Sequence, residues 1–127
     1  MAYQKKSAKV RVYSENAIDR TISRIEHGFN AMPSSKILNI IKDMIQEKDE
    51  LTKSIFIRTF NELLKDYDEQ FMGLDKKAKR FYIHYWVTTS KKKFINHISK
   101  VEDKKFASHC ICLATAFWKE IRKQALK

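Results

Sequence analysis

Apolar residues recur at helical spacing along most of the chain. After Pro33, the residues Ile37, Ile40, Ile41, Met44 and Ile45 lie three and four positions apart. This spacing predicts an amphipathic helix. Similar apolar sets are Ile18, Ile22, Ile25 and Phe29; Ile55, Phe56, Phe60, Leu63, Leu64, Tyr67 and Phe71; Ala78, Phe81, Tyr82, Tyr85 and Trp86; Phe94, Ile95 and Ile98; and Phe106, Cys110, Leu113, Ala114, Phe117, Trp118 and Ile121.

Residues that cap or end helices separate these segments. Ser14 can begin the first helix and Asp103 can cap the last one, because their side-chain oxygens accept hydrogen bonds from free backbone N–H groups. Gly28 and Pro33 close the first segment. We expect Gly73 to end a helix that runs from about residue 52 to residue 71.

The sequence VTTS at positions 87–90 predicts a break. Val87, Thr88 and Thr89 are β-branched, and Ser90 can cap a following helix. We therefore expect one helix over residues 75–87 and a separate short helix after it.

Composition favours a single all-α domain. The 127 residues include two glycines and one proline, too few for the turns of an all-β fold. We expect one compact bundle of five or six helices over residues 14–127, with a basic N-terminal arm over residues 1–13. No apolar run approaches the roughly 18 residues of a membrane span, and no apolar signal segment opens the chain. Two cysteines then fit reduced thiols, so we expect a cytoplasmic protein without membrane contact.

The net charge of +11 is unevenly distributed. Residues 1–13 carry four basic and no acidic residues. Residues 14–72 carry eight basic and eleven acidic residues, and residues 73–127 carry fourteen basic and four acidic. Such concentration indicates a polyanionic partner, most simply the phosphate backbone of RNA or single-stranded DNA.

Basic clusters and aromatic residues alternate in LDKKAKRFYIHYWVTTSKKKF, residues 74–94. The helical spacing of the aromatics predicts that most of the rings are buried and that the lysines stay exposed, with Tyr82 and His84 as candidates for a base contact. Arg80 can hold a phosphate bidentately. The candidate phosphate-binding residues are Lys76, Lys77, Lys79, Arg80, Lys91, Lys92 and Lys93, with Lys104, Lys105, Lys119, Arg122 and Lys123 as a second group.

Catalytic and metal-binding patterns are weak. His109, Cys110 and Cys112 form one cluster inside an apolar helical segment, whereas zinc sites need separated ligand pairs that converge. Two glycines cannot build a glycine-rich phosphate loop. We therefore expect no catalytic residue, metal or cofactor.

Arg20 and His27 leave a ribonuclease as a minor alternative. Six residues separate them, and helical ribonucleases with HEPN domains use an arginine and a histidine at a similar spacing. In those proteins the pair usually lies late in the domain, whereas here it lies in the first predicted helix.

Two separated segments carry a family resemblance. SSKILNII at 34–41 and FINHISKVEDKKFASHCICLATAFWKEIRK at 94–123 resemble the small helical subunit of type III CRISPR effector complexes. The matching positions are Ser34, Ser35, Lys36, Ile37 and Asn39, then Phe106, Cys110 and residues 113–118. The resemblance implies a non-catalytic bundle that stacks with other protein subunits and whose basic residues line a channel for nucleic acid.

The first functional hypothesis is therefore a non-catalytic accessory subunit of a CRISPR ribonucleoprotein that contacts the phosphate backbone. One alternative is a sequence-specific DNA-binding regulator, although neither 34–71 nor 75–99 has the tight glycine turn of a helix-turn-helix. The other is a protein-interaction adaptor or inhibitor that uses its basic face.

Overall fold

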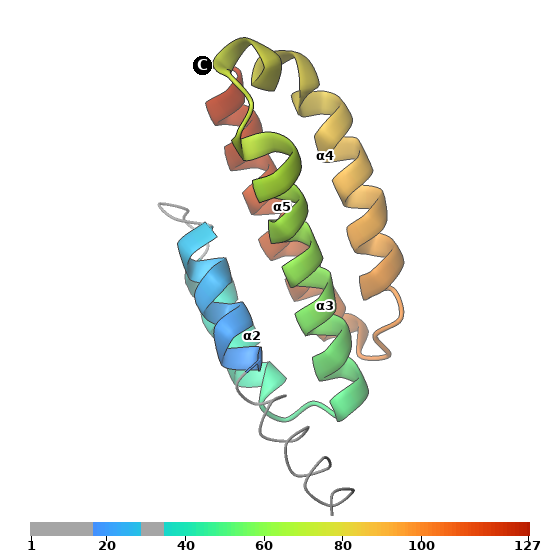
Figure 1. Cartoon of the computed structure of the whole chain (residues 1–127). Helices are drawn as coiled ribbons and strands as arrows, with labels where there is room; N and C mark the ends of the chain where they lie inside the picture. The colour runs from blue at the N-terminus through green and yellow to red at the C-terminus, as the bar shows by residue number, and fades with distance from the viewer. Residues whose placement is uncertain (1–16, 29–34) are drawn as a thin grey trace, which may run out of the picture.

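The computed structural model describes residues 17–28 and 35–127 (Figure 1). The regular elements are a helix over residues 17–28, α2 (Ser35–Ile45), α3 (Glu50–Tyr67), the π-helical turn η1 (Asp68–Met72), α4 (Lys76–Ile98) and α5 (Lys104–Ala125). Every regular element within these residues is helical, which confirms the predicted all-α bundle. The predicted arm over residues 1–13, the cap at Ser14, Phe29 and Pro33 lie outside the described residues.

Three long helices form the body of the bundle. In Figure 1, α3, α4 and α5 run alongside one another, and the shorter helix 17–28 and α2 lie on the side away from α4. α4 packs against α3 and α5, whereas α2 packs against α5. α4 is therefore an edge helix, and one of its sides faces away from the rest of the bundle.

Aspartates begin each of the three long helices. The Asp49 carboxylate accepts a hydrogen bond from the Thr52 backbone N–H at 2.8 Å, and Asp75 accepts one from Ala78 at 2.8 Å. Asp103 accepts two, from Lys105 and Phe106, both at 3.1 Å. These bonds satisfy N–H groups that the helix itself leaves free. The predicted cap at Asp103 is thus confirmed.

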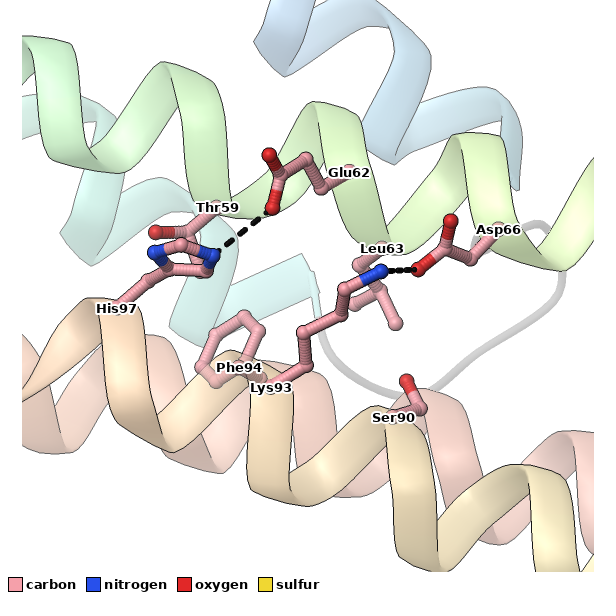
Figure 2. Close-up of a pocket in the computed structure, with 8 residues that line it drawn as sticks. All are labelled: Thr59, Glu62, Leu63, Asp66, Ser90, Lys93, Phe94 and His97. Carbon is pink, nitrogen blue, oxygen red and sulfur yellow. Dashed lines mark hydrogen bonds and ion pairs between the residues drawn. The ribbon is translucent and has the colours of Figure 1, made fainter.

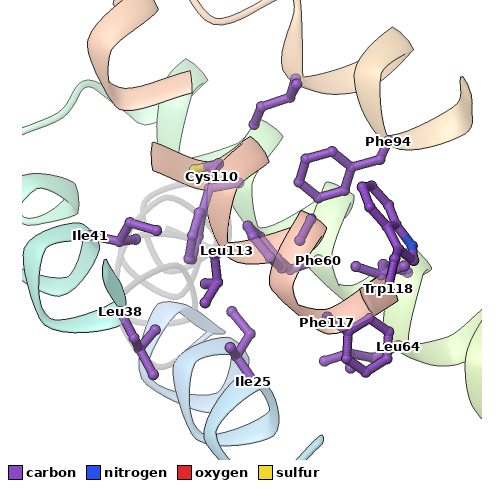
Figure 3. Packing of buried hydrophobic residues seen from close by; sticks show 14 of the residues in the cluster. Ile25, Leu38, Ile41, Phe60, Leu64, Phe94, Cys110, Leu113, Phe117 and Trp118 are labelled. Carbon is purple, nitrogen blue, oxygen red and sulfur yellow. The ribbon is translucent and has the colours of Figure 1, made fainter. Parts of the chain in front are cut away.

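One continuous apolar core joins the helices (Figure 3). Every apolar position predicted for the last helix is buried, from Phe106 to Ile121. In α2 the pattern is shifted: Ile41 and Ile45 are buried as predicted, but Ile40 is 43 % exposed and Leu38 is buried in its place. The helical spacing therefore predicted a buried face of α2 that is rotated by about one residue from the face that is buried in the structure.

Polar contacts attach helix 17–28 to its neighbours. Arg24 donates to Asn61 Oδ1 on α3 at 3.0 Å, and Lys42 on α2 forms an ion pair with Glu26 at 2.6 Å. Gly28 approaches α3 so closely that a Cβ there would lie 2.8 Å from Leu64 Cδ2. Because Gly28 has no side chain, the end of this helix can pack directly against the Leu64 side chain of α3.

The predicted break at 87–90 is wrong, because α4 is continuous from Lys76 to Ile98. Val87 and Ser90 are buried, and the Trp118 indole N–H donates to Ser90 Oγ at 3.0 Å. The Thr88 hydroxyl donates to the His84 carbonyl one turn earlier at 2.8 Å. Tertiary packing and this local bond override the modest helix propensity of the β-branched residues.

One ion pair and one histidine–carboxylate contact cross the interface between α3 and α4 (Figure 2). Lys93 Nζ lies 2.8 Å from Asp66 Oδ2, and His97 Nε2 lies 2.9 Å from Glu62 Oε2. The space that remains between these side chains is about 10 Å³, the volume of roughly one water molecule. This interface is a closed polar contact and does not hold a substrate-sized cavity. Among the described residues, no helix has the length and apolarity needed to cross a membrane.

Candidate nucleic-acid interface

The exposed side of α4 is strongly basic. Its 23 residues include seven lysines or arginines and no acidic residue. All seven fall in two groups, Lys76–Arg80 near the start of the helix and Lys91–Lys93 in its second half. An uncharged segment that contains four aromatic residues separates the groups.

Helical period arranges five exposed residues of α4 in a single line, which we call the outer stripe. The outer stripe consists of Lys77, Phe81, Tyr85, Thr88 and Lys92, spaced four, four, three and four residues apart. All five side chains are exposed. With a rise of 1.5 Å per residue, the two terminal lysines lie about 22 Å apart along the helix axis.

The expectation that most of these aromatic rings are buried is wrong for two of the four. Trp86 is 2 % exposed and belongs to the core, and Tyr82 is half-buried. Phe81, however, is 93 % exposed and Tyr85 is 64 % exposed. An edge helix buries only one of its sides. In α4 the buried side contains Ile83 and Trp86, and Phe81 and Tyr85 lie outside it.

The incorrectly predicted break at residues 87–90 made the buried face of α4 hard to recognise in the sequence. Once α4 is read as one helix, Ile83, Val87, Ser90, Phe94 and Ile98 continue a single pattern at spacings of four, three, four and four. All five are buried. A pattern interrupted at residue 87 is too short to distinguish this face from the neighbouring aromatic one, so Ile83 was missed.

The exposed rings have a defined local setting. The Tyr82 and Tyr85 ring centroids lie 5.4 Å apart, so the half-buried ring supports the exposed one from the side. Next to Phe81 an open groove of about 520 Å³ is lined by Leu74, Lys77 and Tyr82 among others. Asp75 also borders this groove, and its carboxylate caps α4. The rings therefore present apolar surface directly beside a lysine.

Several predicted phosphate-binding residues have partners inside the protein. Lys93 pairs with Asp66, and Arg80 donates to the Leu126 carbonyl at 3.4 Å. Lys91 Nζ lies 5.9 Å from the centre of the Trp118 ring. Lys104 donates to the carbonyls of Ser99 and Val101 at 3.0 and 2.9 Å, which ties it to the end of α4. These four cations are less available to an external phosphate than the sequence indicated.

The remaining predicted cations are open to a partner. Lys76, Lys77 and Lys92 are exposed on α4, and Lys79 is half-buried. On α5 the exposed residues are Lys105, Lys119, Arg122 and Lys123. Lys105, Lys119 and Lys123 share one face of α5 by their spacing of fourteen and four residues. The available cations therefore form two groups, one on the edge helix α4 and one on the neighbouring helix α5.

The two cysteines of the cysteine–histidine cluster lie in different environments. Cys110 is buried, and that burial raises the pKa of its thiol far above the ordinary value, which keeps it protonated. Cys112 is exposed and points away from Cys110. Residues 17–28 and 35–127 contain no group of three histidine, cysteine or acidic residues placed to hold a metal ion.

Arg20 and His27 both lie exposed on helix 17–28. His27 Nδ1 is 2.8 Å from the Ser23 carbonyl within the same helix. Because His27 follows Arg20 at position i+7, the two residues share one side of this helix. The hypothesis of a ribonuclease pair stays a prediction.

No protein-family model, curated protein or solved structure matches the chain. The function of this protein is therefore inferred from the geometry and charge of the described residues and from the sequence resemblance.

Proposed function

We propose that this protein is a non-catalytic nucleic-acid-binding protein that holds a phosphate backbone through α4. The observation that carries this proposal is an edge helix with seven basic and no acidic residues. Lysines that are exposed on such a helix can reach phosphates and gain affinity by releasing counterions. Phosphate contacts of this kind position a strand without reading its sequence.

We further propose a ribonucleoprotein complex as its setting, with other protein subunits on the remaining faces. This part rests on the sequence resemblance to the small helical subunit of type III CRISPR effectors. An edge helix that carries seven basic and no acidic residues would leave the opposite side of the bundle for protein neighbours.

The proposal predicts salt-sensitive binding. Fluorescence anisotropy with labelled single-stranded RNA, single-stranded DNA and duplex DNA should show an affinity for single strands that falls about 10- to 100-fold between about 50 and 200 mM salt. The Lys77→Ala/Lys92→Ala variant should bind more weakly, and the slope of log affinity against log salt should decrease by about 1 to 1.5, since two phosphate contacts are lost.

The matched control is the Lys36→Ala/Lys65→Ala variant. It removes the same two charges from exposed positions on α2 and α3. Equal loss of affinity in the two variants would indicate general attraction by net charge and no role for α4. Binding that does not change with salt would contradict the proposal outright.

A protein adaptor is the competing function, and one specific observation favours it. Phe81 is almost fully exposed, and exposed aromatic surface is common where proteins associate. Co-purified partners that remain bound after nuclease treatment, together with no binding of nucleic acid by the purified chain, would support the adaptor.

A further inference from the structure

The outer stripe combines positive charge with exposed aromatic rings, and binding to a phosphate backbone alone would not require the rings. Lys77 and Lys92 supply charge at its ends, and Phe81 and Tyr85 supply exposed rings between them. Exposing a whole phenylalanine side chain forfeits the free energy that burial would contribute, about 1.5–3 kcal/mol. A ring held in this position is therefore expected to contact a ligand.

The geometry of the rings fits unpaired bases. Phe81 and Tyr85 are four residues apart, so they lie on the same side of α4 and about 6 Å apart along its axis. Tyr85 is steadied by the Tyr82 ring beside it. Unpaired bases expose their flat faces and stack on aromatic side chains whatever their sequence, whereas bases in a duplex are already stacked on each other.

We propose that Phe81 and Tyr85 form a stacking platform, and that the outer stripe prefers single-stranded nucleic acid over duplex. Lys77 and Lys92 hold phosphates on either side of the stacked bases. This inference rests on the proposed function and specifies the class of nucleic acid that the same site takes.

Charge argues against a second copy of the chain as the occupant. In a symmetric dimer the same patch occurs on both subunits, so the outer stripes would bring Lys77 and Lys92 toward the corresponding lysines of the other copy. α4 has no acidic residue to compensate for them. A strand with one negative charge per nucleotide fits this surface better.

The test compares a labelled single-stranded oligonucleotide with an abasic oligonucleotide of the same length and charge, and with a duplex. The wild-type protein should bind the base-bearing strand at least 5-fold more tightly than the abasic strand, as expected for one or two stacked bases. Phe81→Leu/Tyr85→Leu removes both rings but keeps exposed apolar side chains with good helix propensity. It should abolish this preference and leave duplex binding unchanged.

Two further variants separate the outcomes. Phe81→Tyr/Tyr85→Phe keeps both rings and should retain the preference for the base-bearing strand. Lys77→Ala/Lys92→Ala should weaken binding to all three ligands while it retains the preference. If the wild-type protein binds the base-bearing and abasic strands equally and with steep salt dependence, the stacking platform is refuted and the proposed function stands. If it binds none of the three, both the stacking platform and the proposed function are refuted.

Discussion

At the scale of single residues, two aromatic side chains five positions apart have opposite roles. Trp86 is buried and Phe81 is exposed, although both lie in the same uncharged segment of α4. Residue type alone does not separate them, because both are large and apolar. Their direction around the helix decides the difference, and that direction follows from which side of α4 meets α3 and α5.

Ser90 illustrates a residue whose role only its buried partner reveals. Its hydroxyl accepts the Trp118 indole N–H inside the core. We expect Ser90→Ala to lower the free energy of unfolding by about 1–3 kcal/mol, because the buried indole N–H loses its acceptor. Urea denaturation at neutral pH would measure the change.

Thr88→Ala is the matched control for this prediction. Thr88 is exposed and its hydroxyl bonds only within its own helix, so its loss should change stability by less than about 0.5 kcal/mol. Equal effects of the two substitutions would mean that the Ser90–Trp118 bond does not contribute specifically.

At the scale of elements, the continuity of α4 places the lysines on either side of the rings in one rigid line. A break at residues 87–90 would have allowed Lys91–Lys93 to point independently of Lys76–Arg80. Burial of Val87 and Ser90 holds the middle of the helix against the core. The outer stripe exists because this middle segment is helical.

Proline substitution tests that continuity directly. We expect Thr89→Pro to destabilise the protein by about 3 kcal/mol or more, because proline removes a helix hydrogen bond and clashes with the Tyr85 carbonyl. Thr89 is exposed, so no core contact is lost. Thr89→Ala should be neutral or slightly stabilising in the same denaturation measurement. A well-tolerated proline would indicate that a break does occur there.

At the scale of the whole molecule, one ion pair joins distant parts of the chain. Lys48, in the connection between α2 and α3, lies 2.6 Å from Asp103 at the start of α5. The hydrogen bond from Lys48 is the main cause that lowers the pKa of Asp103 below its ordinary value of 3.8, and the backbone N–H of Phe106 adds to it. The folded protein therefore binds this proton less tightly than the unfolded chain does.

The sign of the resulting pH dependence follows from linkage. The stabilisation by Asp103 is fully present above the unfolded pKa, 3.8, and is lost as pH falls through the lower folded pKa. Asp103→Asn keeps a good cap but removes the charge. The difference in free energy of unfolding between wild type and this variant should be largest above about pH 5 and should shrink below about pH 4.

Asp43→Asn serves as the control for this experiment, because Asp43 is an exposed acidic residue of α2. This substitution removes one exposed carboxylate and should change the free energy of unfolding at neutral pH by less than about 0.5 kcal/mol. A difference for Asp103→Asn that does not change with pH would exclude the contribution of the Lys48–Asp103 pair.

Much of the architecture could be predicted from the sequence because it depends on local physics. Apolar spacing predicted most of the helical segments, scarcity of glycine and proline predicted the all-α class, and Asp103 was recognisable as a cap. All seven residues predicted for the buried face of α5 are buried, and the structure adds only Ala107 and Ala125, since a helix packed along its length has one unambiguous apolar stripe.

The sequence by itself determined that the chain folds into helices and that basic residues concentrate toward its second half. Tertiary structure decided which face of α4 is buried, because two apolar faces compete there and only packing against α3 and α5 chooses between them. Packing also decided that residues 87–90 stay helical, that Lys93 is paired with Asp66, and that Phe81 and Tyr85 stay exposed. These outcomes depend on residues far apart in the chain, which no local pattern contains.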